Sequence, residues 1–327
     1  VHSPSVGGSG GEEEPFVNIT ASGRSIFQIN EELAKFTSKI PFFEHMTILV
    51  ISERVAETPQ LFSQLLDTYI RDVNLRRGTK VVVAGNEPIE IFEYLGPENK
   101  LSVSHIDDML ENSSQKIGFF RPVVVGDLEE YHLKGMSYIL PILGLEGRLG
   151  YKAGAVFHGV EKRMVGILSP EEMHGLEMVL NRSPGKVINF LYEDEYYTAE
   201  IVRIRNKIKA DPSLNGNVHV TIDIQLEGTI KEAYHHQNTE NPDVVKGLQD
   251  ALAESVTQSV EQVIHKAQKD LNADIFNISR ILETRHYDTW VKIRDNWEKG
   301  ENYFSHATFD INVDVDIYSV GTINRTD

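Results

Sequence analysis

The composition of the chain excludes several classes of protein before any motif is considered. The chain has 327 residues, of which 40% are hydrophobic, and a mean hydropathy of -0.28. These values are ordinary for a globular protein of two or three domains. The absence of cysteine excludes disulfides and thiolate chemistry. The net charge of -17 opposes binding to phosphate backbones, so nucleic acid is not an expected partner. Because no run of about 18 apolar residues occurs, no membrane span is expected.

The beginning of the chain predicts a mobile segment followed by a small N-terminal domain. Residues 1–15 are rich in Gly, Ser and Glu, a composition that does not build a packed core. We predict the N-terminal domain over 16–101. It opens with a helix over 26–40, because Ser25 and Gln28 form a capping box ahead of apolar residues at helical spacing.

Two buried strands joined by a helix predict a βαβ unit in this domain. Continuous apolar runs at 46–51 and 80–84 are typical of strands that are buried on both faces. Between them, Thr58 and Pro59 supply a helix start, and an apolar stripe follows. Such a unit is normally parallel and right-handed. A third helix is predicted near Pro88.

A middle domain is predicted over 102–183, because the Ser-Pro-Gly turn that follows is a natural boundary. Two helices open this domain, three short strands follow, and a last helix closes it. The predicted ranges are 103–112, 125–134, 138–143, 151–157, 163–168 and 170–180.

The C-terminal domain, 184–327, is predicted to contain three strands, a long helix, two shorter helices and a last strand. This order favours an α+β fold in which the long helix, about 43 Å in length, covers an antiparallel sheet. Trp290 and Trp297 are expected to share one apolar stripe and to pack on that sheet. The ranges are 187–192, 197–209, 217–230, 242–271, 275–282 and 287–297, with the last strand ending near 317.

Candidate metal ligands fail their spacing tests. Four polar residues alternate with apolar ones near the C-terminus, but the sixth and twelfth positions of an EF-hand loop would hold Val315 and Gly321 in place of Gly and Glu. This alternation predicts a strand with one solvated face. Adjacent His235 and His236 would point to opposite faces of a strand, so we interpret them as solvated loop residues. The four polar residues are Asp310, Asn312, Asp314 and Asp316.

Candidate catalytic and surface residues also have simpler interpretations. His45 lies at the start of an apolar strand without a nucleophile motif nearby, so we expect a packed, hydrogen-bonded side chain. Basic residues alternate with apolar ones over 203–209, which predicts the outer face of a strand; an anionic lipid surface or an acidic partner is the alternative. No catalytic, cofactor-binding or metal residue is assigned, no cofactor is expected, and the partner-binding surface stays unknown.

The order of several phrases resembles one known family. These are GRSIFQINEELAKF, FFEHMTILVISERVA and VVVAGNEPIEIF in the first third, KAGAVFHGVEKRMVGILSPEEMHGLEMVL in the middle, and VDVDIYSVGTI at the end. They resemble the Ger(x)C proteins, the C subunits of bacterial spore germinant receptors. The resemblance extends over about 16–323.

The resemblance implies a non-catalytic receptor subunit needed for spore germination in response to small nutrients. It implies assembly with integral-membrane A and B subunits on the outer face of the inner spore membrane. Members of the family begin with a lipoprotein signal peptide and a lipidated cysteine. The printed sequence starts at Val1 without them, so a lipid anchor is expected upstream.

Two other functions stay open. The chain could be a small-molecule binding module whose germinant site lies at a domain junction, near the carboxyl ends of the βαβ strands at 52–54 and 85–87. A cell-wall hydrolase is a distant alternative, because no nucleophile motif is recognisable. The sequence does not identify the germinant.

Overall fold

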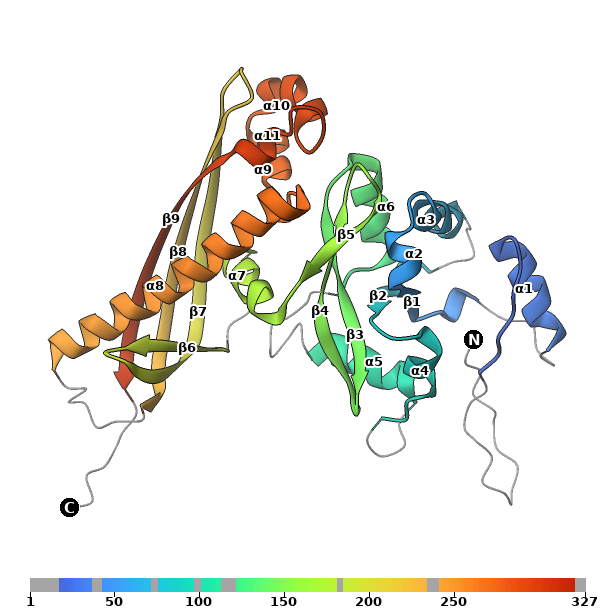
Figure 1. Ribbon diagram of the computed structural model, residues 1–327, viewed down its shortest axis with the longest axis horizontal. Coiled ribbons are helices and arrows are strands. Elements are labelled where there is room, and N and C mark those ends of the chain that lie inside the picture. Colours follow the sequence, from blue (N-terminus) through green and yellow to red (C-terminus); the bar gives the residue numbers. More distant parts are fainter. Residues whose placement is uncertain are drawn as a thin grey trace, which may run out of the picture.

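The chain forms two β-sheets that stand side by side, with helices on their faces and between them (Figure 1). The computed structural model describes residues 18–36, 43–71, 76–96, 101–112, 122–180, 185–233 and 241–320. The predicted mobile segment 1–15 lies outside them. Each sheet packs with helices, in a first half of the molecule that ends at residue 168 and a second half that begins at residue 170, so the predicted α+β class is confirmed.

The first sheet joins segments from both sides of the predicted boundary near residue 101. Its order is β1-β2-β3-β4-β5, with β1, β2 and β3 parallel and β3, β4 and β5 antiparallel. The βαβ prediction is confirmed, since β1 and β2 are parallel, although two helices rather than one connect them. The boundaries of the three predicted domains stay a prediction. The strands are β1 (Ile48–Ser52), β2 (Lys80–Ala84), β3 (Tyr138–Glu146), β4 (Arg148–His158) and β5 (Arg163–Leu168).

Helices cover both faces of this sheet, as expected for strands with continuous apolar runs. Phe62 of α3 and Leu128 of α6 pack with Phe157 in one core cluster, and Ile91 of α4 and Ile106 of α5 belong to another. The helices are α2 (Glu53–Glu57), α3 (Leu61–Arg71), α4 (Pro88–Glu93), α5 (Ser102–Asn112) and α6 (Val125–Lys134).

The first helix, α1 (Ile26–Lys35), has the predicted capping box. Ser25 Oγ accepts a hydrogen bond from the Gln28 backbone N–H at 3.2 Å, and Gln28 Oε1 accepts one from the Arg24 N–H at 2.9 Å. The helix ends at Lys35, earlier than the expected residue 40. Its predicted end at Pro41 lies outside the described residues.

The second sheet has the order β6-β7-β8-β9 and is mixed, not antiparallel as predicted. The first three strands are antiparallel, but β9 runs parallel to β8, with Thr308 opposite His219. The reason is the connection between these two strands, a series of helices that returns the chain to the end of the sheet where β8 begins. The strands are β6 (Lys186–Tyr192), β7 (Glu195–Pro212), β8 (Val218–Ala233) and β9 (Thr308–Val320).

The connecting helices cover one face of this sheet. The predicted long helix is α8 (Pro242–Lys266), which continues into a π-helical turn (Ala267–Leu271). It crosses the sheet diagonally in Figure 1. The remaining helices are α9 (Ile278–Arg285), α10 (Tyr287–Ile293) and α11 (Tyr303–His306), with a 3-10 turn (Arg294–Asn296) between the last two.

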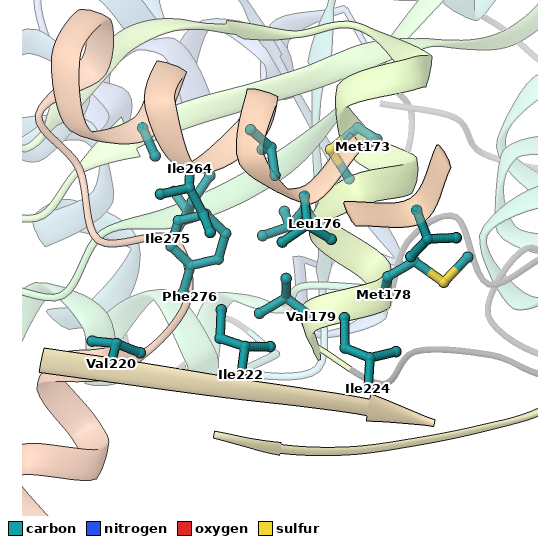
Figure 2. Close-up of a cluster of buried hydrophobic side chains, with 14 of the residues drawn as sticks. Met173, Leu176, Met178, Val179, Val220, Ile222, Ile224, Ile264, Ile275 and Phe276 are labelled. Atoms are coloured by element: carbon teal, nitrogen blue, oxygen red, sulfur yellow. The ribbon is translucent and has the colours of Figure 1, made fainter. Parts of the chain in front are cut away.

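Helix α7 (Pro170–Leu180) lies between the two sheets and follows β5 directly. Figure 2 shows its Leu176 and Val179 facing Ile222 of β8, with Ile264 of α8 on the other side. Because the hydrophobic cluster includes Leu168 of the first sheet as well, the core of the second half continues into the first. This contact holds the two sheets next to each other.

The approach of α7 to α8 depends on Gly175. A Cβ atom at this position would lie 2.3 Å from the Ser259 carbonyl oxygen and 2.8 Å from its carbon. These are backbone atoms of α8, so they cannot move without displacing the helix. We therefore expect Gly175→Ala to lower the free energy of unfolding by about 3 kcal/mol, measured by urea denaturation.

Gly126 is the matched control, because it also lies in a helix, where the nearest atom to an added Cβ is 3.4 Å away, an ordinary contact. Gly126→Ala should leave stability unchanged or raise it by up to about 1 kcal/mol through helix propensity. If the two substitutions changed the free energy of unfolding equally, the close contact between α7 and α8 at Gly175 would be contradicted.

Candidate functional site

The four alternating polar residues Asp310, Asn312, Asp314 and Asp316 lie on the solvent-exposed side of β9. His219 Nε2 is 3.2 Å from Asp310 Oδ2, and Asn312 donates to Asp223 Oδ1 at 2.9 Å, both across to β8. The predicted strand with one solvated face is therefore confirmed. Within the described ranges, no group of three or more His, Asp or Glu side chains is placed to hold a metal ion.

The basic residues of 203–209 lie on the exposed side of β7, as predicted. Arg203 and Arg205 both pair with Glu227 of β8. His45 is exposed at the end of a 3-10 turn (Phe43–His45), so the expectation that it is packed is wrong. His235 and His236 lie outside the described residues.

The polar side chains at the carboxyl ends of β1 and β2 take part in local structure. Ser52 Oγ accepts a hydrogen bond from the Val55 N–H at 3.3 Å and caps α2. Asn86 Oδ1 accepts one from the Leu145 N–H at 3.0 Å and fixes the end of β3. The expected germinant site at 52–54 and 85–87 stays a prediction.

A buried polar cluster joins the two halves of the molecule elsewhere, at the side of the first sheet where β3 begins. Ser137, just before β3, donates from its Oγ to Glu298 Oε1 at 2.6 Å. The same hydroxyl accepts from the Gly159 N–H at 2.9 Å, in the turn between β4 and β5. Glu298 Oε1 also accepts from the Asp274 N–H. All three side chains are buried, so these hydrogen bonds link the two halves in a region that is largely shielded from solvent.

Asp274 organises the part of the cluster that belongs to the second half. Its carboxylate accepts hydrogen bonds from the backbone N–H groups of Ile278 and Ser279, at 3.1 and 2.6 Å, at the start of α9. It also accepts from the Trp297 indole Nε1 at 3.0 Å. One carboxylate thus fixes the start of α9 and the chain segment that carries Glu298.

Burial controls the proton affinity of the cluster. The pKa of Glu298 is raised to about 8, mainly because burial removes solvent from the carboxyl group and also because the negative charge of Asp274 is close to it. Burial also raises the pKa of Asp274, against hydrogen bonds that favour its ionised form. The neighbouring His158 has a lowered pKa, because burial disfavours the imidazolium. At neutral pH the cluster therefore favours a protonated Glu298 beside a neutral His158.

A cavity of about 370 Å³ lies beside this cluster, between the end of α6 and the helices α9 and α10. Trp290 and Trp297 both line it, with ring centroids 5.9 Å apart. Trp297 is buried and follows the 3-10 turn, whereas Trp290 is half-buried on α10. The predicted shared helical stripe is wrong, because only Trp290 lies on α10, but both side chains belong to the hydrophobic cluster of the second sheet, as predicted.

Sequence reasoning missed Ser137, Asp274 and Glu298. Asp274 stands alone among Ala273, Ile275 and Phe276, and a single acid inside an apolar run is a signal for a buried carboxylate. Ser137 and Glu298 carry no comparable signal, because the residues to which they hydrogen-bond lie far from them in the sequence.

Comparison with known proteins gives consistent matches along the whole chain. Residues 1–145 match the profile described as "Spore germination protein N-terminal domain", and residues 152–321 match "Spore germination B3/ GerAC like, C-terminal". The chain belongs to the GerAC-like family of spore germination proteins. The resemblance to the Ger(x)C proteins is thereby confirmed.

Named relatives of the GerAC-like family align over nearly all of the chain. Spore germination protein YndF of Bacillus subtilis (strain 168) is 25% identical over 96% of this chain and 77% of its own length. Spore germination protein B3 of the same organism is 24% identical over 95% of this chain and 82% of its own length. The crystal structure of the GerBC protein has the same fold, with a TM-score of 0.69 and 21% identity over 86% of this chain and 79% of that one.

The described part of this GerAC-like chain has no helix that combines the length and the apolar composition needed to cross a bilayer.

Proposed function

We propose that the chain is the C subunit of a nutrient germinant receptor and that it acts in spore germination without a catalytic role of its own. The observation that carries this proposal is the succession of the two family matches, 1–145 and 152–321, over almost the entire chain. Relatives named as spore germination proteins align over the same length. The fold shared with GerBC supports it independently of sequence identity.

The subunit would work at the outer face of the inner spore membrane, together with membrane-embedded A and B subunits. Family membership supports both the partners and the place. We expect a lipidated cysteine upstream of Val1 to hold it there. A single acyl chain binds a membrane only weakly, with a constant of about 10⁴ M⁻¹, so the two chains of a diacylglycerol and contacts with the other subunits would both contribute.

Deletion of the gene tests this proposal. Spores without the subunit should lose the response to at least one nutrient germinant, measured as the fall in optical density after nutrient addition. Complementation with the wild-type chain or with Gly126→Ala should restore the response, whereas the destabilised Gly175→Ala should restore less of it. A deletion strain that responds to every nutrient at the normal rate, but releases cortex fragments more slowly, would favour the cell-wall hydrolase instead.

A second candidate function is the binding of a small molecule by this subunit. The specific observation in its favour is the junction cavity of about 370 Å³, which lies between the two halves and beside a buried carboxyl group. Small-molecule sites commonly have volumes of about 300–1,000 Å³ and lie at domain interfaces. Binding there would make the subunit sensitive to a nutrient, and isothermal titration of the purified chain with nutrients tests it.

A further inference from the structure

We propose that the junction cavity binds a small organic carboxylate with an apolar body. This inference gives the second proposed function a site and a ligand class, and it rests on that function. It follows from three properties of the cavity: the charge of its rim, the buried carboxyl group beside it, and the apolar side chains that form part of its walls.

The cavity has a small excess of basic side chains, although the chain as a whole is strongly acidic. Four basic side chains line the cavity against three acidic ones, whereas the chain as a whole has a net charge of -17. Lys134 of α6 pairs across the junction with Glu283 of α9 at 3.3 Å. Arg280, Arg294 and Lys299 form no ion pair with any residue that the structure describes. These three cations are therefore available to an anion, and guanidinium groups match the geometry of a carboxylate.

The buried carboxyl group adds a donor of fixed position. Both hydrogen bonds of Glu298 within the described chain are accepted by Oε1, from Ser137 and from the Asp274 N–H. The other carboxyl oxygen, Oε2, is therefore available to a ligand in the cavity that Glu298 lines. Since burial raises the pKa of Glu298 to about 8, the proton at neutral pH lies on Oε2 and can be donated to a ligand oxygen.

Apolar side chains from both halves of the molecule form part of the cavity walls, beside the polar groups. Met136 and Val160 belong to the first half, and Trp290 and Trp297 to the second. An aromatic or branched aliphatic body would bury its surface against these side chains, with a gain of about 25 cal/mol for each Å² removed from water. A ligand that fills the cavity therefore touches both halves at once.

The chain offers a direct optical probe for this site. Trp290 and Trp297 are its only two tryptophans, and both line the cavity. Titration with phenylpropionate, phenylpropanol and phenylpropylamine compares an anion, a neutral molecule and a cation of nearly the same shape. We expect phenylpropionate to change the tryptophan emission and to bind at least about ten-fold more tightly than the other two. Equal affinities for the three compounds would contradict the proposed ligand class.

Rim variants provide the second part of the test. Arg294→Ala and Lys299→Ala should each weaken phenylpropionate binding by about ten-fold. Lys292→Ala is the matched control, because Lys292 is an exposed cation of α10 that does not line the cavity, and its affinity should equal that of the wild type. If the control and the rim variants bind equally, the anion is not held at this rim.

The pH dependence of phenylpropionate binding distinguishes the contribution of Glu298 from that of the basic rim residues. Affinity should fall as pH rises through about 8, because ionised Glu298 repels a carboxylate; Glu298→Gln should remove this fall. The titratable groups nearest to Glu298 are Asp274 and His158, and Lys134, Glu283, Asp295 and Lys299 line the same cavity. If the purified chain binds phenylpropionate but deletion spores germinate normally, the proposed site is supported and the receptor role is rejected. If deletion spores germinate poorly but the purified chain does not bind phenylpropionate, the receptor role is supported and the proposed site is rejected.

Discussion

Replacing Asp274 with alanine should lower the free energy of unfolding by about 3–5 kcal/mol. The side chain is 2% exposed and accepts hydrogen bonds from two N–H groups at the start of α9 and from the Trp297 indole. Alanine would leave these buried donors without an acceptor, and each unsatisfied donor costs about 1–3 kcal/mol. Relief of the buried charge offsets part of this loss.

Urea denaturation followed by tryptophan emission measures the effect of Asp274→Ala. The native-state emission should also shift, since the indole of Trp297 loses its partner. Asp270→Ala is the matched control, because Asp270 is exposed four residues earlier in the chain and its removal should change stability by less than about 0.5 kcal/mol. A loss below about 1 kcal/mol for Asp274→Ala would show that this carboxylate does not organise the junction.

The stability of the protein should depend on pH through Glu298. The pKa of this carboxyl is about 8 in the folded chain, against 4.5 for an ordinary Glu. The folded state therefore keeps the proton that the unfolded state loses. The resulting stabilisation is complete below about pH 4.5 and disappears as pH rises through about 8. The whole change amounts to about 5 kcal/mol.

The measurement compares wild type with Glu298→Gln by urea denaturation at intervals from about pH 4 to pH 9. Glutamine keeps the acceptor for Ser137 and cannot ionise, so the free energy of unfolding of the variant should fall much less over this range. Asp274, whose pKa is also raised, titrates in both proteins and largely cancels in the comparison. The exposed Asp295→Asn variant should follow the wild-type curve. Parallel curves for wild type and Glu298→Gln would exclude a strongly raised pKa.

The predictions that depended on nearby residues agree best with the structure. The apolar run at 80–84 is β2, the segment 163–168 is β5, and the helix over 170–180 is α7. The capping box at Ser25 also forms, with both of its hydrogen bonds. These features depend on hydrophobic periodicity and on hydrogen bonds between residues three or four positions apart, and both can be read along the chain.

The pairing of distant strands could not be predicted in the same way. The last strand was expected to be antiparallel, yet β9 runs parallel to β8 because the intervening helices return the chain to the starting end of the sheet. The alternation of polar and apolar residues in 308–317 fits either direction, since the side-chain period of a strand is the same in both. Likewise, no local signal indicates that β2 pairs with β3 across the helices α4, α5 and α6.

By itself, the sequence determined the family, the α+β class and most of the helices and strands, because these follow from local patterns and from the order of the matching phrases. The junction of the two halves was decided only by the tertiary structure. Ser137 and Glu298 are separated by 161 positions, and neither residue type indicates burial. Their partnership, the raised pKa of Glu298 and the cavity beside it exist because packing of α9 and α10 against the first sheet removes water from these polar groups.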